Sequence, residues 1–352
     1  MKILLVTFSD NADHQDTLFG MYECVRERAD VSLLAIQKPK VPLDMDKHVW
    51  LVDCPKRPGV TRKTFDVKLL AQLIHRIRKE RFDVIYFESL HVWNLPIMLF
   101  AGKATVFHEI HDVIPHEGDK QARLVDWMNR AICKLTDYIV LKNKTYIDQM
   151  SRTYHFPRDR IRYCALWRRY PAYTKPQHTK DVLFFGRMNP YKGVENLLQI
   201  AKACPEIHFS VVGKVDPQVE ETVCELSALP NVTVQTGYVS DEEMKDAFTR
   251  ADWIIAPYRS ATQSGVVTDA YKYARPVVAF DVGAIPEQVV DGISGYLVPA
   301  GDNDAFSACL RKAVQMPEEE YDRMTRQAYD FGREKYAAAG AVNRFLALVT
   351  DV

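Results

Sequence analysis

Two separate segments of the chain carry the residues best suited to holding a diphosphate. The first is FFGRMNPYKGVENLL (184–198), an apolar strand that breaks into a loop and then enters a helix. Its loop holds Gly186, Arg187, Lys192 and Gly193. Glycine lets a backbone approach a ligand closely, a guanidinium offers a planar fork for phosphate, and an ammonium offers a mobile point charge. The loop therefore predicts phosphate contacts, and the alternative is that both cations are ordinary solvated loop residues.

The second segment is QSGVVTDAYKYARPVVAFDVGAIPE (263–287), which puts a turn of small residues at a helix start. Ser264 and Gly265 form that turn, and Asp269 lies one turn into the helix. Unpaired amides at a helix start attract phosphate, and a nearby carboxylate can accept hydrogen bonds from ribose hydroxyls. Together the two segments predict a pocket for a nucleotide diphosphate. Alternatively, Asp269 stabilises only the dipole of its own helix.

The elements that must position these residues alternate along the whole chain. Apolar strand-like runs are followed by amphipathic helical segments, which is typical of an α/β protein with parallel sheets. In the first half we expect strands at 2–8, 31–36, 48–53, 83–88, 104–109 and 137–142, with helices clearest at 64–80 and 121–135. In the second half we expect strands at 181–186, 208–213, 232–237, 252–257, 275–280 and 295–299.

Length and composition predict two domains. A chain of 352 residues with 47% hydrophobic residues can bury two cores of ordinary size. Residues 169–180 lack apolar periodicity and read as a linker between domains at 1–168 and 181–330. We expect two doubly wound Rossmann-like domains facing across a cleft, with both phosphate-binding loops at strand carboxyl ends. The last helical stretch, 318–349, is long, and a helix at about 330–352 is a candidate to pack back on the first domain.

Cysteine usage and the N-terminus bear on the compartment. The seven cysteines are scattered without a CxxC pair and are odd in number, which disfavours a disulfide framework or a zinc site. The opening MKILLVTFSD is too short in its apolar run for a signal peptide and reads as a first strand. No apolar run approaches the ~20 residues that a membrane span needs. We expect a cytoplasmic protein, with a peripheral place at the inner face of the membrane as a further possibility.

At this point residues 181–301 resemble the large family of retaining GT-B glycosyltransferases that use nucleotide-sugar donors (glycosyl transferases group 1, family 4-like). The matching pieces include FFGRMNPYKGVENLLQIAKA, HFSVVGKV and DAYKYARPVVAFDVGAIPEQVVDGISGYLVPAGD, in the family's order and spacing. The first half matches through its strand pattern and through FHEIHDVIP (107–115), which looks like the family's HD-containing loop. The resemblance implies a GT-B fold and sugar transfer to an acceptor hydroxyl with retention of anomeric configuration. It also implies a UDP- or GDP-sugar donor and no metal or other cofactor, because protein groups neutralise the diphosphate.

The resemblance also assigns roles to single positions. Arg187 and Lys192 match the basic pair on the diphosphate, and Gly265 and Val266 match the turn at the phosphate and sugar. The remaining donor-side matches are Gly186 and Ser264 beside those groups, Asp269 at the ribose, Glu287 in the GxxPE turn, and Gly237 with Tyr238 at the base.

The chain departs from the family pattern in places. Ala261 stands where the family has a second glutamate, eight positions before Asp269, so sugar identity does not carry over. The family's glycine-rich loop after the first strand is replaced by SDNADHQDTLFG (9–20). These departures keep open a catalytically inactive, glycosyltransferase-like subunit that binds nucleotide or a partner. A sugar phosphorylase or epimerase on the same architecture is a third reading.

Polar residues near strand ends of the first half are further candidates. His111 and Asp112 directly follow the strand at 104–109, so His111 could bond the donor sugar or orient an acceptor, and Asp112 could orient His111. With His108, His116 and Glu109 close in sequence, a metal site is conceivable, but strand-end placement outside an HExxH helix supports it weakly, and we expect no metal. We name Asp13 and His14, in the loop after the first strand, and Glu88, at the end of the strand at 83–88, as weaker candidates.

The charge is unevenly distributed. Residues 1–170 hold 28 Lys and Arg against 21 Asp and Glu, and the segment 56–81 alone holds nine against two. Such a stretch could lie on an anionic membrane, which would suit a lipid-linked acceptor. The alternative is a solvated helix face that buries Leu69, Leu70, Leu73 and Ile77. No nucleic-acid-binding module accompanies the stretch, so we expect no nucleic acid as partner. The family resemblance implies an oligosaccharide or lipid-linked acceptor, in bacterial polysaccharide or glycolipid synthesis.

Overall fold

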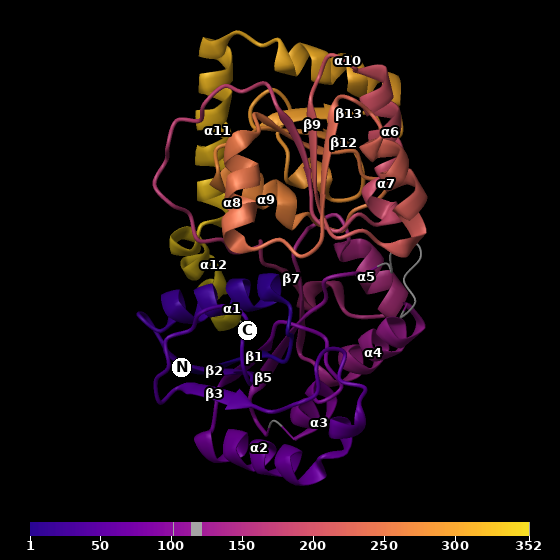
Figure 1. Ribbon diagram of the computed structural model, residues 1–352. Coiled ribbons are helices and arrows are strands. Elements are labelled where there is room, and N and C mark those ends of the chain that lie inside the picture. The colour runs from indigo at the N-terminus through magenta and orange to yellow at the C-terminus, as the bar shows by residue number, and fades with distance from the viewer. Residues whose placement is uncertain (101, 114–121, 352) are drawn as a thin grey trace. The chain divides into compact units, whose positions relative to one another are not determined.

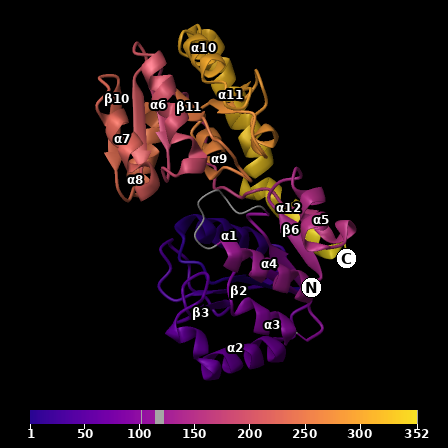
Figure 2. The ribbon, with the colours of Figure 1, turned by 90° about the vertical axis from the view of Figure 1, so that its right-hand side faces the viewer.

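A computed structural model describes residues 1–100, 102–113 and 122–351 as two compact units (Figure 1). Unit 1 contains the described residues up to 113, those from 122 to 169, and 336–351. Unit 2 contains residues 170–335. Figure 2 shows the same two units after a quarter turn. Each unit is a parallel sheet with its own helices, so the expected α/β fold with two doubly wound sheets is confirmed.

Unit 1 is built on a seven-stranded parallel sheet in the order β3-β2-β1-β4-β5-β6-β7. Its strands are β1 (Lys2–Thr7), β2 (Asp30–Ile36), β3 (Val49–Val52), β4 (Val84–Phe87), β5 (Thr105–Glu109), β6 (Tyr138–Leu141) and β7 (Ile161–Tyr163). Its helices are α1 (Ala12–Val25), α2 (Val67–Glu80), α3 (Asn94–Leu99), α4 (Ala122–Leu135), α5 (Ile147–Tyr154) and α12 (Ala338–Thr350). Alternate residues of β1 enter opposite cores: Leu4 and Val6 lie in one, and Ile3 and Leu5 in the other. The sheet is thus covered on both faces, as expected when every strand is parallel and apolar.

Unit 2 has a six-stranded parallel sheet in the order β10-β9-β8-β11-β12-β13. Its strands are β8 (Val182–Phe185), β9 (Phe209–Gly213), β10 (Val232–Thr236), β11 (Trp253–Ala256), β12 (Val277–Phe280) and β13 (Gly295–Val298). Its helices are α6 (Val194–Ala203), α7 (Glu220–Ser227), α8 (Asp241–Arg250), α9 (Gly265–Lys272), α10 (Asn303–Val314) and α11 (Glu318–Tyr336). Helix α6 packs against both α7 and α10. Ligands bind at the carboxyl ends of the strands in sheets of this kind.

The local sequence explains where many helices begin. The side chains of Asn11, Asp66, Ser240, Ser264 and Asp302 each accept a backbone N–H at the start of a helix. Short polar side chains of this kind satisfy amides that would otherwise have no partner, and each contributes about 1 kcal/mol. The cap at Asn11 matters most for function, because it starts α1 only four residues after β1.

The sequence-based expectations are corrected at three places. Residues 9–20 are not a loop throughout: α1 begins at Ala12, so Asp13 and His14 lie in its first turn. Strand β7 was not expected, because its three residues are too few to show a pattern. The helical stretch 318–349 is two helices that part at Ala337, whose ψ of 137° is extended.

Arg168 explains the break at Ala337. Its backbone N–H donates to Tyr336 O at 2.8 Å, and its carbonyl accepts from Ala338 N at 3.2 Å. The extended residue between the two helices therefore pairs with Arg168 as a short parallel bridge. Helix α12 then packs against α1, and its Val342 and Phe345 join the unit 1 core beside Tyr22.

Candidate functional site

Three loops of unit 2 that carry candidate residues lie at the carboxyl ends of neighbouring strands. Gly186 follows β8, Ser264 follows β11 across an eight-residue loop, and Glu287 follows β12. The strand order reverses between β8 and β11, and open parallel sheets bind ligands at this kind of switch point. The fold thus brings together two segments that are about eighty residues apart in the sequence.

Gly186 is the position at which the two predicted phosphate-binding segments meet. Its φ is +103°, and a Cβ there would lie 2.7 Å from the ammonium of Lys192 and 3.6 Å from Cγ2 of Val266. The ammonium also lies 3.4 Å from the carbonyl of Phe185 and 5.3 Å from the centre of the Tyr258 ring. Lys192 therefore holds its charge at the end of β8, beside the first turn of α9.

Gly193 joins the loops after β8 and β11. Its φ is +68°, and a Cβ there would lie only 1.9 Å from the carbonyl oxygen of Pro257. The same oxygen accepts a hydrogen bond from Asn196 Nδ2 at 3.0 Å. A side chain at position 193 would push the two loops apart, so glycine is needed here for a close backbone approach.

Gln288 fixes the start of α9 and was missed by the sequence analysis. Its side-chain amide accepts from Ser264 N at 2.7 Å and donates to Ser264 O at 3.0 Å. Its own carbonyl accepts from Tyr271 Oη at 2.8 Å. The residue is buried, and the only signal in the sequence is that it follows the PE of the GxxPE turn. It holds the helix start from which backbone amides are available to an anion.

The other donor-side candidates lie around this junction at different depths. Arg187 is exposed on the loop after β8, whereas Asp269, in α9, and Glu287 are half-buried. The backbone carbonyl of Glu287 accepts a hydrogen bond from Lys335. Gly237 and Tyr238 follow β10, which β9 separates from β8, and the Tyr238 side chain is 81% exposed. The structure brings Gly186, Lys192 and Val266 within contact distance, and the roles of the others stay predictions.

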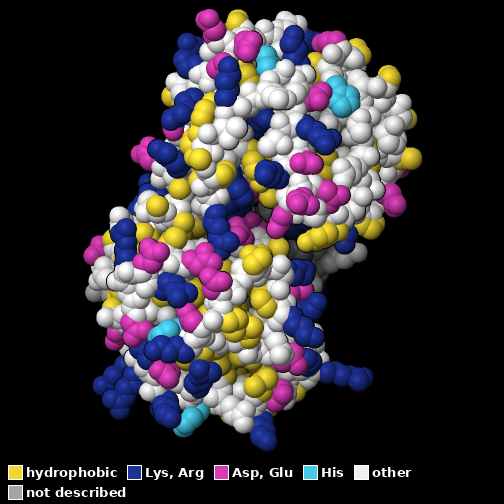
Figure 3. Space-filling view, turned by 60° about the vertical axis from the view of Figure 1, so that its left-hand side comes forward, with side chains coloured by type: hydrophobic (Ala, Val, Ile, Leu, Met, Phe, Trp, Pro, Cys, Tyr) yellow, Lys and Arg dark blue, Asp and Glu magenta, His cyan; other side chains and the backbone are white. Residues whose placement is uncertain are grey.

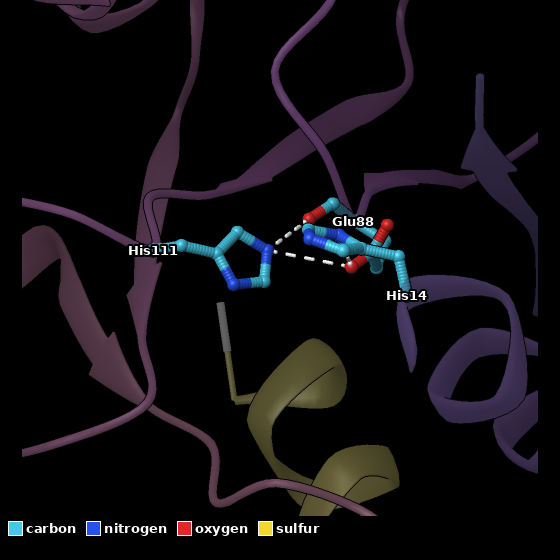
Figure 4. A group of neighbouring side chains, drawn as sticks. All are labelled: His14, Glu88 and His111. Atoms are coloured by element: carbon cyan, nitrogen blue, oxygen red, sulfur yellow. Dashed lines mark hydrogen bonds and ion pairs between the residues drawn. The ribbon is translucent and has the colours of Figure 1, made fainter. Parts of the chain in front are cut away.

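A second group of candidates gathers at the carboxyl ends of β1, β4 and β5 in unit 1. Figure 4 shows His14, Glu88 and His111 pointing toward one another. Glu88 Oε1 lies 2.6 Å from His14 Nδ1 and 3.3 Å from His111 Nε2. His111 Nε2 also lies 2.7 Å from the backbone oxygen of Glu88. Strands β1 and β4 are neighbours at the switch point of this sheet, so the group occupies the same topological place as the junction in unit 2.

A second buried carboxylate, Glu109, also lies close to His111 Nε2. Its Oε2 is 3.4 Å from His111 Nε2. Its Oε1 accepts from Lys142 Nζ at 2.6 Å and from the Tyr86 hydroxyl. Glu88 Oε2, in turn, accepts from Thr7 Oγ1 at 3.0 Å. The cluster therefore contains two carboxylates that are each about 1% exposed.

Burial and hydrogen bonding move the pKa values of this cluster in opposite directions. Burial alone would raise the pKa of Glu88, but its contacts with His14 and His111 outweigh burial and bring that pKa well below the ordinary value. For His111, burial would lower the pKa, but the hydrogen bond to Glu88 and the charges of Glu88 and Glu109 raise it overall. Burial lowers the pKa of His108 to about 4. The carboxyl edge of the unit 1 sheet thus contains one histidine with a raised pKa, His111, and one with a lowered pKa, His108.

His14, Glu88 and His111 are residue types that ligate metals, and their ligand atoms lie within 4.8 Å of one another. Their polar atoms are already engaged. Arg57, which can only donate, lies 3.1 Å from His14 Nε2, and His111 Nε2 donates to the Glu88 carbonyl. A metal would have to displace these interactions, and the absence of a metal stays a prediction.

The metal hypothesis drawn from sequence combined His111 with other residues, namely His108, His116, Glu109 and Asp112. His108 is buried, with its Nδ1 bonded to the Glu109 carbonyl at 2.7 Å and its Nε2 to Asn94 Nδ2 at 2.9 Å. Asp112 is half-buried next to His111, and His116 lies outside the described residues. Asp13, at the start of α1, pairs with Arg168 at 2.8 Å. The residue that gathers the histidines is therefore Glu88, which sequence reasoning named only as a weak candidate.

The basic segment 56–81 is partly core and partly exposed. Leu73 and Ile77 of α2 are buried, so the helix does bury the predicted apolar face. Val60 and Phe65, before the helix, and Val67, its first residue, are 61%, 82% and 70% exposed. In Figure 3, many dark-blue Lys and Arg side chains project from unit 1, in the lower part of the picture. In the part of the chain that the structure describes, no helix combines the length and the apolar character needed to cross a membrane.

Comparisons with known proteins agree with this architecture. A model of glycosyl transferases group 1 matches residues 179–316, and a model of the glycosyl transferase 4-like domain matches residues 18–167. The phosphatidyl-myo-inositol mannosyltransferase of Mycobacterium leprae is 32% identical over 176 residues, which are 47% of this chain and 42% of the relative. The alpha-maltose-1-phosphate synthase of Mycolicibacterium smegmatis is 29% identical over 240 residues, which are 59% and 60% of the two chains. The chain spans about half the length of the curated relatives it matches.

A solved structure extends the likeness to the whole chain. HepE from Anabaena, in complex with UDP and glucose, covers 100% of both chains with a TM-score of 0.76 and 14% sequence identity. At this identity the likeness shows the fold alone. The two family matches, in series, fall on the two sheets described above. The chain belongs to the group 1 glycosyltransferases and has their GT-B fold.

Proposed function

We propose that the chain transfers a sugar from a nucleotide-sugar donor to an acceptor hydroxyl with retention of anomeric configuration. The observation that carries this proposal is the junction of Gly186, Lys192 and Val266 at the switch point of the unit 2 sheet. It joins a cation and a helix start, the two features that bind a diphosphate. Relatives support a donor of this class, since HepE has been solved with UDP-glucose.

The chemistry assigns a task to each group. The bond from sugar C1 to the diphosphate oxygen breaks, a bond from C1 to the acceptor oxygen forms, and the acceptor proton passes to the departing diphosphate. Negative charge develops on the diphosphate as the first bond breaks. The Lys192 ammonium and the amides at the start of α9 stand ready to stabilise that charge, and preorganised groups of this kind contribute most of many rate enhancements.

The finer assignments are also proposals. Arg187 adds a second cation to the diphosphate, Asp269 binds the ribose, and Glu287 contacts the donor. Gly237 and Tyr238 hold the base, which is uracil or guanine, and no metal or other cofactor takes part. His111 and Asp112 serve the sugar or the acceptor. The acceptor is an oligosaccharide or a lipid-linked sugar in bacterial polysaccharide or glycolipid synthesis.

Isothermal titration with UDP, GDP and ADP tests the nucleotide. We expect binding of UDP or GDP that weakens on Lys192→Ala and does not weaken on Lys202→Ala. Lys202 is a suitable control because it lies on α6 in an exposed ion pair with Glu225 at 3.0 Å. Failure of all three nucleotides to bind would refute the proposed donor class.

The alternative of an inactive nucleotide-binding subunit is motivated by Ala261. This residue is 2% exposed, and its carbonyl accepts from Ala284 N at 3.0 Å, which ties the loop after β11 to the GxxPE turn. A small buried residue here can serve as structural support instead of a sugar contact. Donor hydrolysis or transfer that is lost on Lys192→Ala would exclude the inactive subunit, whereas nucleotide binding without turnover of any UDP- or GDP-sugar would favour it.

We further propose that the protein is cytoplasmic and that unit 1 contacts an anionic membrane through the basic stretch 56–81, peripherally at the inner face. Phe65 and Val67 supply exposed apolar side chains, and Arg62 and Lys63 supply charge beside them. Apolar insertion combined with basic residues is how peripheral proteins bind anionic lipids. Co-sedimentation with phosphatidylglycerol vesicles should show binding that falls on Phe65→Ser and at high salt. Equal sedimentation of wild type and variant would contradict the proposal.

A further inference from the structure

We propose that Glu88 and Glu109 hold His111 in its imidazolium form and so make it a fixed cation at the carboxyl edge of the unit 1 sheet. In this arrangement the two glutamates are positioning residues. The inference deepens the proposed function and rests on it, since it treats His111 as part of the transfer site.

Three acceptor oxygens of described residues lie close to His111 Nε2. The atom lies 2.7 Å from the backbone oxygen of Glu88, 3.3 Å from its Oε1 and 3.4 Å from Oε2 of Glu109. Dashed lines in Figure 4 mark the first two. None of these oxygens carries a proton when the carboxylates are ionised, so Nε2 carries one. The N–H of the imidazole is therefore directed at a carbonyl and lies close to both carboxylates.

His14 is the second ring beside Glu88. Its Nδ1 lies 2.6 Å from Glu88 Oε1, and the guanidinium of Arg57 lies 3.1 Å from its Nε2. Glu88 therefore has two imidazole neighbours, of which His111 is also close to Glu109.

A protonated His111 would supply counter-charge to the buried carboxylates. Glu109 already pairs with Lys142 at 2.6 Å, and both side chains are at most 1% exposed. Glu88 is equally buried, and it accepts from Thr7 Oγ1 at 3.0 Å and lies beside His14 and His111. A buried carboxylate without a counter-charge is costly, and an imidazolium at His111 lies within reach of both carboxylates.

The described groups that face His111 come from several elements. They include Asp13 and His14 of α1, Arg57 before α2, Glu88 after β4, and His108 and Glu109 of β5. Lys142, after β6, pairs with Glu109. Burial and Arg57 oppose protonation of His111, whereas Glu88 and Glu109 favour it and prevail, so that its pKa is raised.

The consequence for the reaction is a positive charge that persists near neutral pH. A free histidine, with an ordinary pKa of about 6.5, is mostly neutral at pH 7. An imidazolium at the strand end can attract the negative charge that develops during transfer without first acquiring a proton. We therefore expect the transfer rate to fall on the alkaline side as His111 loses its proton, at a pH above about 6.5.

Histidine Cε1–H resonances followed by NMR between pH 5 and 9 test the inference directly. The His111 resonance, identified by its loss in His111→Asn, should titrate with a midpoint above about 6.5. In Glu88→Gln the midpoint should fall to that value or below. Glu80→Gln is the matched control, because Glu80 also forms an ion pair, with Lys2 at 2.6 Å, but on the surface. A wild-type midpoint at or below 6.5 would overturn the inference, and this result does not depend on whether the variants fold.

A pH profile of kcat/KM gives the second reading. Its alkaline limb should move to lower pH in Glu88→Gln and return partly in Glu88→Asp, whereas a purely structural role would lower the rate at all pH values alike. The NMR titration uses no substrate, so a raised midpoint in a protein that binds no nucleotide would refute the proposed function alone. An ordinary midpoint in a protein that binds nucleotide would refute this inference alone.

Discussion

The carboxyl edges of the two sheets are built from different kinds of chemical groups. In unit 1 the edge is made of buried ionisable side chains, with Glu88, Glu109 and Lys142 all nearly inaccessible. In unit 2 the edge is shaped by glycines and by a buried amide, with Gly186 and Gly193 where loops approach and Gln288 bonding the start of α9. The unit 1 edge contains buried charged side chains, whereas the unit 2 edge leaves space in which charge can be bound.

This difference indicates which interactions each edge depends on. A buried charge needs its counter-charge, so unit 1 should respond strongly to pH and to loss of a single partner. The unit 2 edge is formed by backbone and glycine and carries little charge of its own. Unit 2 should therefore respond to changes in shape and to loss of Lys192. Matched substitutions in the two units separate these two dependences.

The largest effect should follow removal of a buried counter-charge. Lys142→Met leaves Glu109 without its ammonium, which lies 2.6 Å away and is 1% exposed. Breaking a buried pair by removing one partner costs about 3–5 kcal/mol. In unit 2, Lys175→Met removes an ion pair of equal length, 2.6 Å from Asp322, but the lysine is 58% exposed, so the loss of stability should be much smaller. Urea unfolding measures both, and equal losses would remove the contrast between the units.

Acid should destabilise unit 1 through its buried neutral histidines. Burial lowers the pKa of His91 and of His108 to about 4, against an ordinary 6.5. Because the unfolded chain then binds protons that the folded chain refuses, stability is lost as pH falls from about 6.5 toward 4, by about 2 kcal/mol for each residue at pH 5. His108→Asn should flatten the fall measured by urea unfolding at pH 7 and pH 5. An unfolding free energy that does not change over this range would contradict the assignment.

A smaller effect, on nucleotide affinity, should come from adding a methyl group at Gly186 in unit 2. In Gly186→Ala the new Cβ would meet the Lys192 ammonium at 2.7 Å, so the flexible end of the lysine has to move away. We expect nucleotide affinity to fall about tenfold, which is about 1.4 kcal/mol. Gly292→Ala is the matched control, since Gly292 also has a positive φ, of +72°, with nothing within 4 Å of an added Cβ. If both variants bind nucleotide equally, displacement of Lys192 has no role.

Sequence patterns predicted unit 2 better than unit 1, and the reason is physical. The fold class and twelve of the strands followed from apolar runs, because a strand buried on both faces is marked by its own composition. The meeting of Gly186 with Val266 followed from two short motifs at the ends of adjacent strands. Gln288 was missed because a buried amide bonding a distant backbone leaves no periodic pattern.

The unit 1 cluster could not be read from the sequence in the same way. His14, Glu88 and His111 come from three segments, and only the strand order brings them to one edge. Reading residues 9–20 as a loop hid the fact that α1 begins at Ala12 and presents His14 from its first turn. The expected group of His108, His111 and His116 was based on closeness in the sequence. In the structure, the cluster is formed by residues that follow different strands of one sheet.

The most direct test of the central claim is calorimetric titration of UDP and GDP into wild type and Lys192→Ala, with Lys202→Ala as control. The account predicts measurable binding of at least one nucleotide and a loss of about 10- to 100-fold on Lys192→Ala alone, as expected for a charged hydrogen bond of about 1.5–3 kcal/mol. Wild-type affinity in Lys192→Ala, or no binding of either nucleotide by the unaltered protein, would contradict it.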